Sequence, residues 1–135
     1  MSNLKLPTLT YAALDARVPA LDSYSAVGHN VTIGYKTSAY RFGTTICIQH
    51  HSTTIAALAS DGAVHVTNDG YDSSTTRNRL HSILVDNGIP YGVTQRDFVQ
   101  VLVSRDRSEA YPDFVSAYFS PDGVLIAFNG QDLRA

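Results

Sequence analysis

Apolar residues recur with the period of a helix in one stretch near the middle of the chain. Three of them fall on one helical stripe, and an Asn-Gly pair typical of a helix end follows: Leu80, Ile83, Leu84 and then Asn87-Gly88. Four hydroxyl residues, 73–76, precede the stripe, and a Ser or Thr oxygen can accept a hydrogen bond from an unpaired N–H of the first helical turn. The pattern predicts a helix from about Thr75 to Asp86, capped by Ser74 or Thr75.

The chain before this helix carries the apolar and polar alternation of antiparallel strands. Three strands are expected in a row, at 44–50, 55–59 and 64–68. Asp61-Gly62 between the last two is a strong hairpin signal, because this pair can take positive φ at both central positions. A two-residue turn there would pair Ala57 with Val66. The preceding strand would then add Ile46 and Ile48 to the same apolar face.

Shorter patterns fill the rest of the chain. A helix over about 11–17 is expected behind Thr8 and Thr10, and Pro19 would end it because the residue before a proline avoids the helical region. Residues 18–30 have little periodicity and are expected to form a loop. Further strands are predicted at 31–36, at 95–103, and on both sides of the Pro-Asp-Gly turn within 120–123, namely 114–119 and 124–128.

The order of these elements predicts the fold class. Residues 98–103 are apolar on both faces, which is typical of a central strand. A short helix, a meander of about four strands, the main helix and about three strands follow one another. We therefore expect a single α+β domain over residues 1–135, with a mainly antiparallel sheet and the main helix packed on one face.

Composition and charge narrow the class of protein. Hydrophobic residues make up 44% of 135 residues, which is enough for one core. Lys and Arg number 10 against 12 Asp and Glu, and with a net charge of −2 any attraction to nucleic acid must come from a local patch. The single cysteine, Cys47, lies between two isoleucines, so we expect it to be buried. Without a signal-peptide run or an apolar stretch that could span a membrane, a cytoplasmic location is expected.

The start of the main helix carries a recognisable motif. It reads Gly-aromatic-x-Thr/Ser-x-Thr-Thr-x-x-Arg-apolar and is formed by Gly70, Tyr71, Ser73, Thr75, Thr76, Arg79 and Leu80. Two other places belong with it: His29-Asn30-x-Thr32 and His51-x-Thr53-x-Ile55. Together they resemble a family of small proteins carried by tailed phages of actinobacteria, in which Trp would stand at Tyr71. The resemblance implies a phage-encoded protein in the host cytoplasm and brings no general activity with it.

Catalytic and metal-binding patterns are missing from the sequence. None of the five histidines has the spacing of a known ligand motif. His50 and His51 would point to opposite faces of a strand unless the chain bends there, and a tight bend is expected at His51-Ser52. No Gly-x-Ser-x-Gly nucleophile elbow is present. We expect neither a metal nor a cofactor, and the sequence leaves open whether the protein is an enzyme.

The start of the main helix is the best candidate for a ligand site. Free N–H groups and the positive end of the helix dipole suit an anion there. Four residues add hydrogen-bond donors: Thr75, Thr76, Arg77 and Arg79. The resemblance adds four more candidate binding residues: His29, Asn30, His51 and Thr53. The alternative is that a hydroxyl merely caps the helix and that Arg79 is a surface or salt-bridged residue.

Three functional hypotheses follow. The first is a phage accessory protein that binds a host or phage macromolecule. The second is a nucleotide or nucleic-acid binder that uses the helix start, Thr75–Arg79. It requires basic residues to gather on one face: Lys36, Arg77, Arg79 and Arg96. The third is a hydrolase that uses His29 or His51 with Arg79, and it requires a pocket that encloses these side chains.

Overall fold

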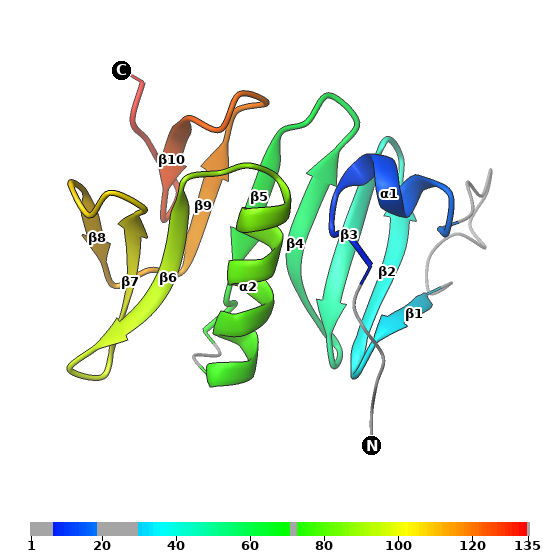
Figure 1. The fold of residues 1–135 in the computed structure, drawn as a ribbon, viewed down its shortest axis with the longest axis horizontal. Coiled ribbons are helices and arrows are strands. Elements are labelled where there is room, and N and C mark those ends of the chain that lie inside the picture. Colours follow the sequence, from blue (N-terminus) through cyan, green and yellow to red (C-terminus); the bar gives the residue numbers. More distant parts are fainter. Residues whose placement is uncertain (1–6, 19–29, 71–72, 135) are drawn as a thin grey trace.

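The computed structural model describes residues 7–18, 30–70 and 73–134 (Figure 1). This part of the chain contains two helices, α1 (Tyr11–Asp15) and α2 (Ser74–Asp86). Eleven strands accompany them: β1 (Val31–Gly34), β2 (Thr37–Phe42), β3 (Thr45–His50), β4 (Thr53–Ala59), β5 (Val64–Thr67), β6 (Tyr91–Arg96), β7 (Val99–Ser104), β8 (Ala110–Pro112), β9 (Ser116–Phe119), β10 (Leu125–Phe128) and β11 (Gln131–Asp132).

The strands form two sheets, in which every neighbouring pair is antiparallel. The large sheet has the order β1-β2-β3-β4-β5-β9-β10-β11, and the small sheet has the order β6-β7-β8. Helix α2 lies across one face of the large sheet, and the small sheet lies beside α2 (Figure 1). The expectation of an α+β fold with a mainly antiparallel sheet and a helix on one face is confirmed. The described part has more strands than the sequence predicted, and they are divided between two sheets.

One hydrophobic core joins the helices and both sheets. Its fully buried members include Ile46, Ile48, Leu58 and Val66 from the large sheet, Leu80, Ile83 and Leu84 from α2, and Leu102 from the small sheet. The rings of Tyr91 and Phe119 connect the two sheets, with centroids 5.4 Å apart. Helix α1 is attached through Arg41, whose guanidinium bonds the carboxylate of Asp15 at 2.7 Å.

The β4–β5 hairpin is one residue out of its predicted register. Its turn holds three residues instead of two, because the N–H of Ala59 bonds the carbonyl of Ala63 at 2.9 Å. Val66 therefore lies opposite Ala56 and not opposite Ala57. Because side chains alternate along a strand, this shift of one residue exchanges the two faces of β4. Ala57, which the sequence assigned to the core, therefore lies on the outer face opposite His65, and Ala56 and Leu58 are buried in its place.

That outer face of the large sheet carries a row of uncharged side chains in register: Tyr40, Cys47, Ala57, His65 and Tyr118. Cys47 is 9% exposed, so its predicted burial is confirmed, and this burial raises the pKa of its thiol. The rings of His65 and Tyr118 stack, with centroids 4.1 Å apart and planes 10° from parallel. Cys47 is the one buried member of this row, and Ala57 beside it is half-buried.

The predicted strand 95–103 is wrong at its centre. Strand β6 ends at Arg96 and β7 begins at Val99, and the two residues between them have positive φ: 50° at Asp97 and 68° at Phe98. Positive φ at both central residues is the mark of a two-residue hairpin turn. Phe98, expected in the core, is 89% exposed. The β7 part is a central strand, as expected, but of the small sheet.

Smaller differences have similar causes. Strand β2 was not predicted, because Tyr35-Lys36 makes the β1–β2 turn without Gly or Asn, and Lys36 takes a φ of 50°. Helix α1 is capped by the predicted Thr10, whose hydroxyl accepts from the N–H of Ala13 at 3.2 Å. The loop predicted at 18–30 lies almost wholly outside the described residues.

Helix α2 begins one residue earlier than predicted, and its cap is Ser73 in place of Ser74 or Thr75. The hydroxyl of Ser73 accepts from the N–H of Thr76 at 3.2 Å and donates to the hydroxyl of Thr76 at 3.0 Å. Thr76 is only 4% exposed. The helix ends at Asp86, as predicted. The first turn of α2 is therefore fixed by the hydroxyls of Ser73 and Thr76.

Candidate functional site

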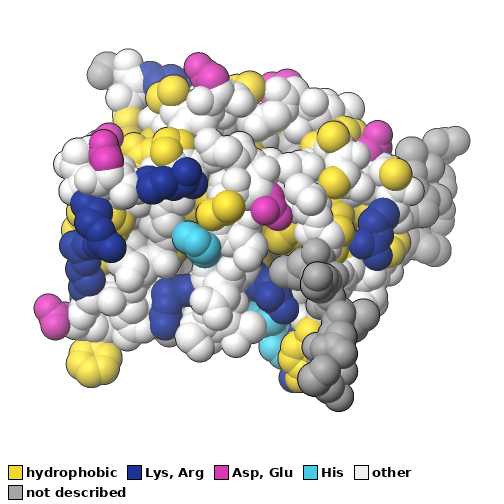
Figure 2. Space-filling view, in the orientation of Figure 1, with side chains coloured by type: hydrophobic (Ala, Val, Ile, Leu, Met, Phe, Trp, Pro, Cys, Tyr) yellow, Lys and Arg dark blue, Asp and Glu magenta, His cyan; other side chains and the backbone are white. Residues whose placement is uncertain are grey.

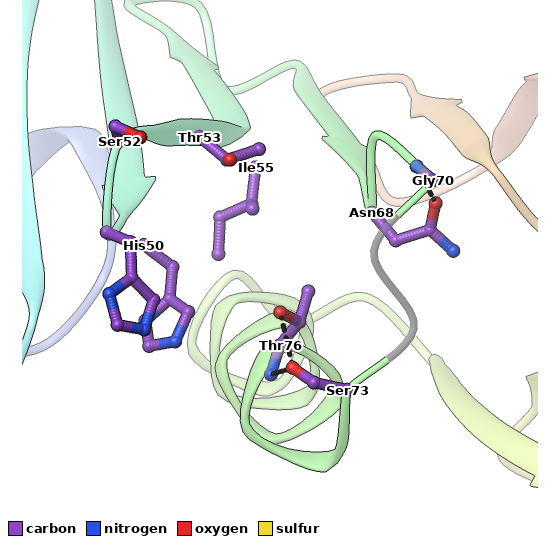
Figure 3. A pocket seen from close by; sticks show the side chains of 9 residues that line it. His50, Ser52, Thr53, Ile55, Asn68, Gly70, Ser73 and Thr76 are labelled. Atoms are coloured by element: carbon purple, nitrogen blue, oxygen red, sulfur yellow. Dashed lines mark hydrogen bonds between the residues drawn. The ribbon is translucent and has the colours of Figure 1, made fainter.

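A cavity of about 400 Å³ lies beside the first turn of α2 (Figure 3). The β3–β4 turn, the loop after β5 and the start of α2 supply its walls. The lining residues are His50, His51, Ser52, Thr53, Ile55, Asn68, Gly70, Ser73 and Thr76. This volume falls within the range of small-molecule sites, about 300 to 1,000 Å³.

A left-handed residue brings two histidines to this cavity. His51 has a φ of 57°, and its N–H bonds the carbonyl of Lys36 in the neighbouring turn at 2.7 Å. The bend expected at His51-Ser52 is thereby confirmed. It lets the rings of His50 and His51 meet edge to face, with centroids 4.5 Å apart.

His50 is the unusual group of the site. Its side chain is 5% exposed, yet its Nδ1 atom has no hydrogen-bond partner. Burial lowers the pKa of His50, and the nearby charges of His51, Arg79 and Lys36 lower it further. The imidazole is therefore held neutral at physiological pH. A buried polar atom without a partner is rare in folded proteins.

The opposite wall is fixed by hydrogen bonds of the backbone and of Asn68. The Asn68 side chain is 3% exposed, donates to the carbonyl of Phe114 at 2.9 Å and accepts from the N–H of Gly70 at 2.8 Å. Ser73 and Thr76 complete this wall, and Figure 3 shows them at the near end of α2. Hydrogen bonds thus join Asn68 to Gly70 and Ser73 to Thr76 within this wall.

Three of the residues that the sequence singled out line the cavity together: His51, Thr53 and Thr76. They come from a turn, a strand and a helix, so only the fold unites them. Thr75 is exposed and lies outside the lining. Arg77 is half-buried and has interactions of its own. His29 lies outside the described residues.

Arg79 and Asn30 hold neighbouring strands and turns. The Nε of Arg79 donates to the hydroxyl of Thr37 at 3.0 Å, and its Nη2 donates to the carbonyl of Tyr35 at 3.3 Å. The Asn30 amide donates to the side chain of Gln49. Arg79 thus ties α2 to the β1–β2 turn, and it contributes a positive charge near His50 without lining the cavity.

Sequence reasoning missed His50 and Asn68. A signal for His50 was present, because it lies two and four residues after the core residues Ile48 and Ile46 and so shares their face. The burial of Asn68 had no such signal, since it follows from the approach of Phe114, 46 residues away.

The described lining favours an anion. It contains no carboxylate, its hydroxyl and imidazole groups can donate hydrogen bonds, and the positive end of α2 faces it. Among the residues that the structure describes, no group of three or more His, Cys, Asp or Glu side chains could hold a metal ion. The described part of the chain also contains no helix that is long and apolar enough to cross a membrane.

A second cavity of about 310 Å³ lies between α2 and the small sheet. Its lining includes the polar residues His81, Thr94, Ser104, Arg105 and Arg107. Figure 2 shows dark blue side chains gathered over α2 and the small sheet, around one histidine. This surface is basic although the whole chain has a net charge of −2.

Comparison with known protein families gives the origin of the chain. A family model described as Kyanoviridae Gp96 protein matches residues 22–122, well over half of the sequence. The chain belongs to this family. It is therefore a small phage protein, as its sequence implied, but Kyanoviridae infect cyanobacteria, so the match lends no support to an actinobacterial host. No curated protein and no solved structure matches the chain.

Proposed function

We propose that this phage protein works by binding, and that the cavity at the start of α2 takes a small ligand with a phosphate group, such as a mononucleotide. The observation that carries the proposal is the lining of this cavity, which offers hydroxyl and imidazole groups at the positive end of α2 and contains no described carboxylate. Hydroxyl and imidazole groups can each donate a hydrogen bond to a phosphate oxygen.

Electrostatics supports a phosphate in preference to a cation. The charges of Lys36 and Arg79 both lower the pKa of His50, so their positive potential reaches the wall of the cavity. The positive end of α2 adds to the same potential. This potential would repel a cation and attract an anion.

A hydrolase remains the alternative proposal, since His51 and Thr53 lie in one cavity. Two observations weigh against it: the guanidinium of Arg79 is directed to the β1–β2 turn, and no described hydroxyl is hydrogen-bonded to Nδ1 of His50. A nucleophile and its base would need such a bond. Recovery of unchanged AMP after long incubation would favour binding, and release of phosphate would favour the hydrolase.

A macromolecular partner from the host or the phage needs a larger surface than this cavity. A stable protein interface buries about 800 Å² on each partner. A macromolecular partner would therefore bind mainly outside this cavity.

The direct test is calorimetric titration with AMP, inorganic phosphate and adenosine. We expect AMP to bind, phosphate to compete with it and adenosine to bind more weakly. His51→Asn keeps a residue type that tolerates positive φ and removes the imidazole, so it should weaken AMP binding by about tenfold while the protein stays folded.

His81→Gln is the matched control, because His81 is an exposed histidine that lines the other cavity. It should leave AMP binding unchanged. The proposal is overturned if neither AMP nor phosphate binds at millimolar concentration, or if His81→Gln weakens binding as much as His51→Asn.

A further inference from the structure

Exposed cationic and hydroxyl side chains follow one another along strand β6 of the small sheet and in the loop after β7. At one end, Arg105 and Arg107 line the cavity beside α2 together with Thr94. Arg96 lies two residues beyond Thr94 on the same strand and therefore on the same face. Phe98 follows in the turn at the other end. We propose that this strip of exposed side chains binds single-stranded nucleic acid.

The arginines of the strip have no acidic partner among the described residues. The two ion pairs in this part of the chain use Arg41 and Arg134. Arg96, Arg105 and Arg107 are exposed and take part in neither pair. Nη2 of Arg105 donates to the carbonyl of Ile89 at 3.5 Å, and the other N–H groups of Arg105 and those of Arg96 and Arg107 can bind phosphate.

Two carboxylates near the strip, those of Asp106 and Glu109, are bonded to hydroxyl groups, and a third, that of Asp97, lies in the exposed turn between Arg96 and Phe98. Asp106 accepts hydrogen bonds from Ser104 at 2.9 Å and from Ser108 at 2.7 Å. Glu109 accepts from the phenol groups of Tyr91 and Tyr111. These bonds draw both carboxylates to the serine and tyrosine hydroxyls and keep them from pairing with the arginines.

Phe98 gives the strip an exposed aromatic ring. Its side chain is 89% exposed, and its φ of 68° is a conformation that a bulky residue adopts at a cost. Glycine or asparagine would relieve this cost at no loss to the core. An exposed aromatic ring beside Arg96 can serve as a surface on which a nucleic-acid base stacks, which would account for a strained residue at this position.

The size and shape of the strip favour a single strand. Arg96 lies opposite Val99, at the start of β7, and Arg105 follows the end of β7. Because β7 spans six residues, the two arginines lie about 20 Å apart along the sheet. Single-strand sites hold about 4 to 16 nucleotides, with phosphates on basic side chains and bases on aromatic rings. In a double helix the base faces are already stacked and could not reach Phe98.

This site is independent of the cavity at the start of α2, because their linings share no residue. Each proposal can therefore fail without the other. Nucleic acid bound to the strip would lie on the small sheet and not at the helix start, Thr75–Arg79.

The test is fluorescence anisotropy with a labelled 12-nucleotide thymidine strand, at several salt concentrations, with the full chain. We expect binding that weakens with salt, with a slope of log K against log salt of about −0.7 for each phosphate contact. The double variant Arg105→Ala/Arg107→Ala should make this slope shallower by about 1.4. Phe98→Ala should weaken binding by about 5- to 150-fold and leave the slope unchanged.

Two control variants match these changes elsewhere. Arg134→Ala removes a positive charge from the end of the large sheet, and Phe42→Ala removes another exposed aromatic ring, 67% exposed, from its outer face. Both should bind the strand like the parent protein. Thermal melts of all variants show whether each is folded.

Three results would overturn the inference. The first is no binding of the strand by the parent protein at 50 mM salt. The second is equal weakening by the strip variants and the two controls. The third is tighter binding of a 12-base-pair duplex than of the strand, with Phe98→Ala without effect.

Discussion

Arg79 illustrates at the scale of single residues how a position chosen for binding can serve the fold. Its guanidinium bonds Thr37, which is 1% exposed, and the carbonyl of Tyr35. We predict that Arg79→Ala lowers the free energy of unfolding by about 1 kcal/mol, because two hydrogen bonds between α2 and the β1–β2 turn are lost. Chemical denaturation measures this loss. Arg96→Ala, exposed and unpaired, should cost under about 0.5 kcal/mol, and equal losses would contradict the assignment.

The hydroxyls at the start of α2 make a second prediction at this scale. Ser73→Ala removes the cap and the bond to Thr76, so it should cost about 1 kcal/mol of stability. Thr75→Ala should be neutral or slightly stabilising, since Thr75 is exposed and alanine favours a helix. Thermal melts of the two variants measure this difference in stability. A larger loss of stability for Thr75→Ala than for Ser73→Ala would show that Thr75 caps the helix.

Two histidines should make stability depend on pH. Burial lowers the pKa of His50 and of His65 in the folded protein. In the unfolded chain a histidine takes up its proton near pH 6.5, so between this value and the lowered pKa the unfolded state binds more protons. Stability is therefore fully present above about pH 6.5 and falls as the pH decreases through this window.

Urea midpoints at pH 7.5 and pH 5.5 measure this dependence. His50→Gln and His65→Gln should each reduce the difference between the two midpoints. His81→Gln, at an exposed position, should leave it unchanged. Midpoints of the parent protein that rise on acidification would refute the prediction.

At the scale of elements, the β6–β7 hairpin joins a stability cost to a proposed use. Phe98→Gly should raise the melting temperature, because glycine takes positive φ without the strain of about 1 kcal/mol that a side chain brings. The ring makes no contribution to the core at 89% exposure. The same variant should lose affinity for the thymidine strand. A lower melting temperature would show that the ring stabilises the fold.

At the scale of the whole molecule, the shared core predicts one cooperative unit. Leu102 of the small sheet is 0% exposed and belongs to the same core as α2 and the large sheet. Leu102→Ala should therefore cost about 2 to 5 kcal/mol and shift far-UV and near-UV melting curves together. Val124→Ala, at a position 55% exposed, is the control. Two separate transitions would show that the small sheet unfolds alone.

The sequence determined the elements whose signals are local. The stripe of Leu80, Ile83 and Leu84 and the stop at Asp86 placed α2, and the turn signal at 120–123 placed β9 and β10. Hydrogen bonding and side-chain period act within a few residues, so these features can be read without the rest of the fold. The resemblance in the same stretch likewise indicated a phage protein, which the family match confirms.

The tertiary structure alone decided the registers, the second sheet and the site. A turn of two or three residues at Asp61 fits the same sequence, and only packing against the core selects the register that buries Ala56 and Leu58. The apolar run that includes Phe98 predicted a core residue, but the turn between β6 and β7 exposes its side chain. The cavity unites His50, Asn68 and Ser73 because distant segments meet, and no local pattern records which segments will do so.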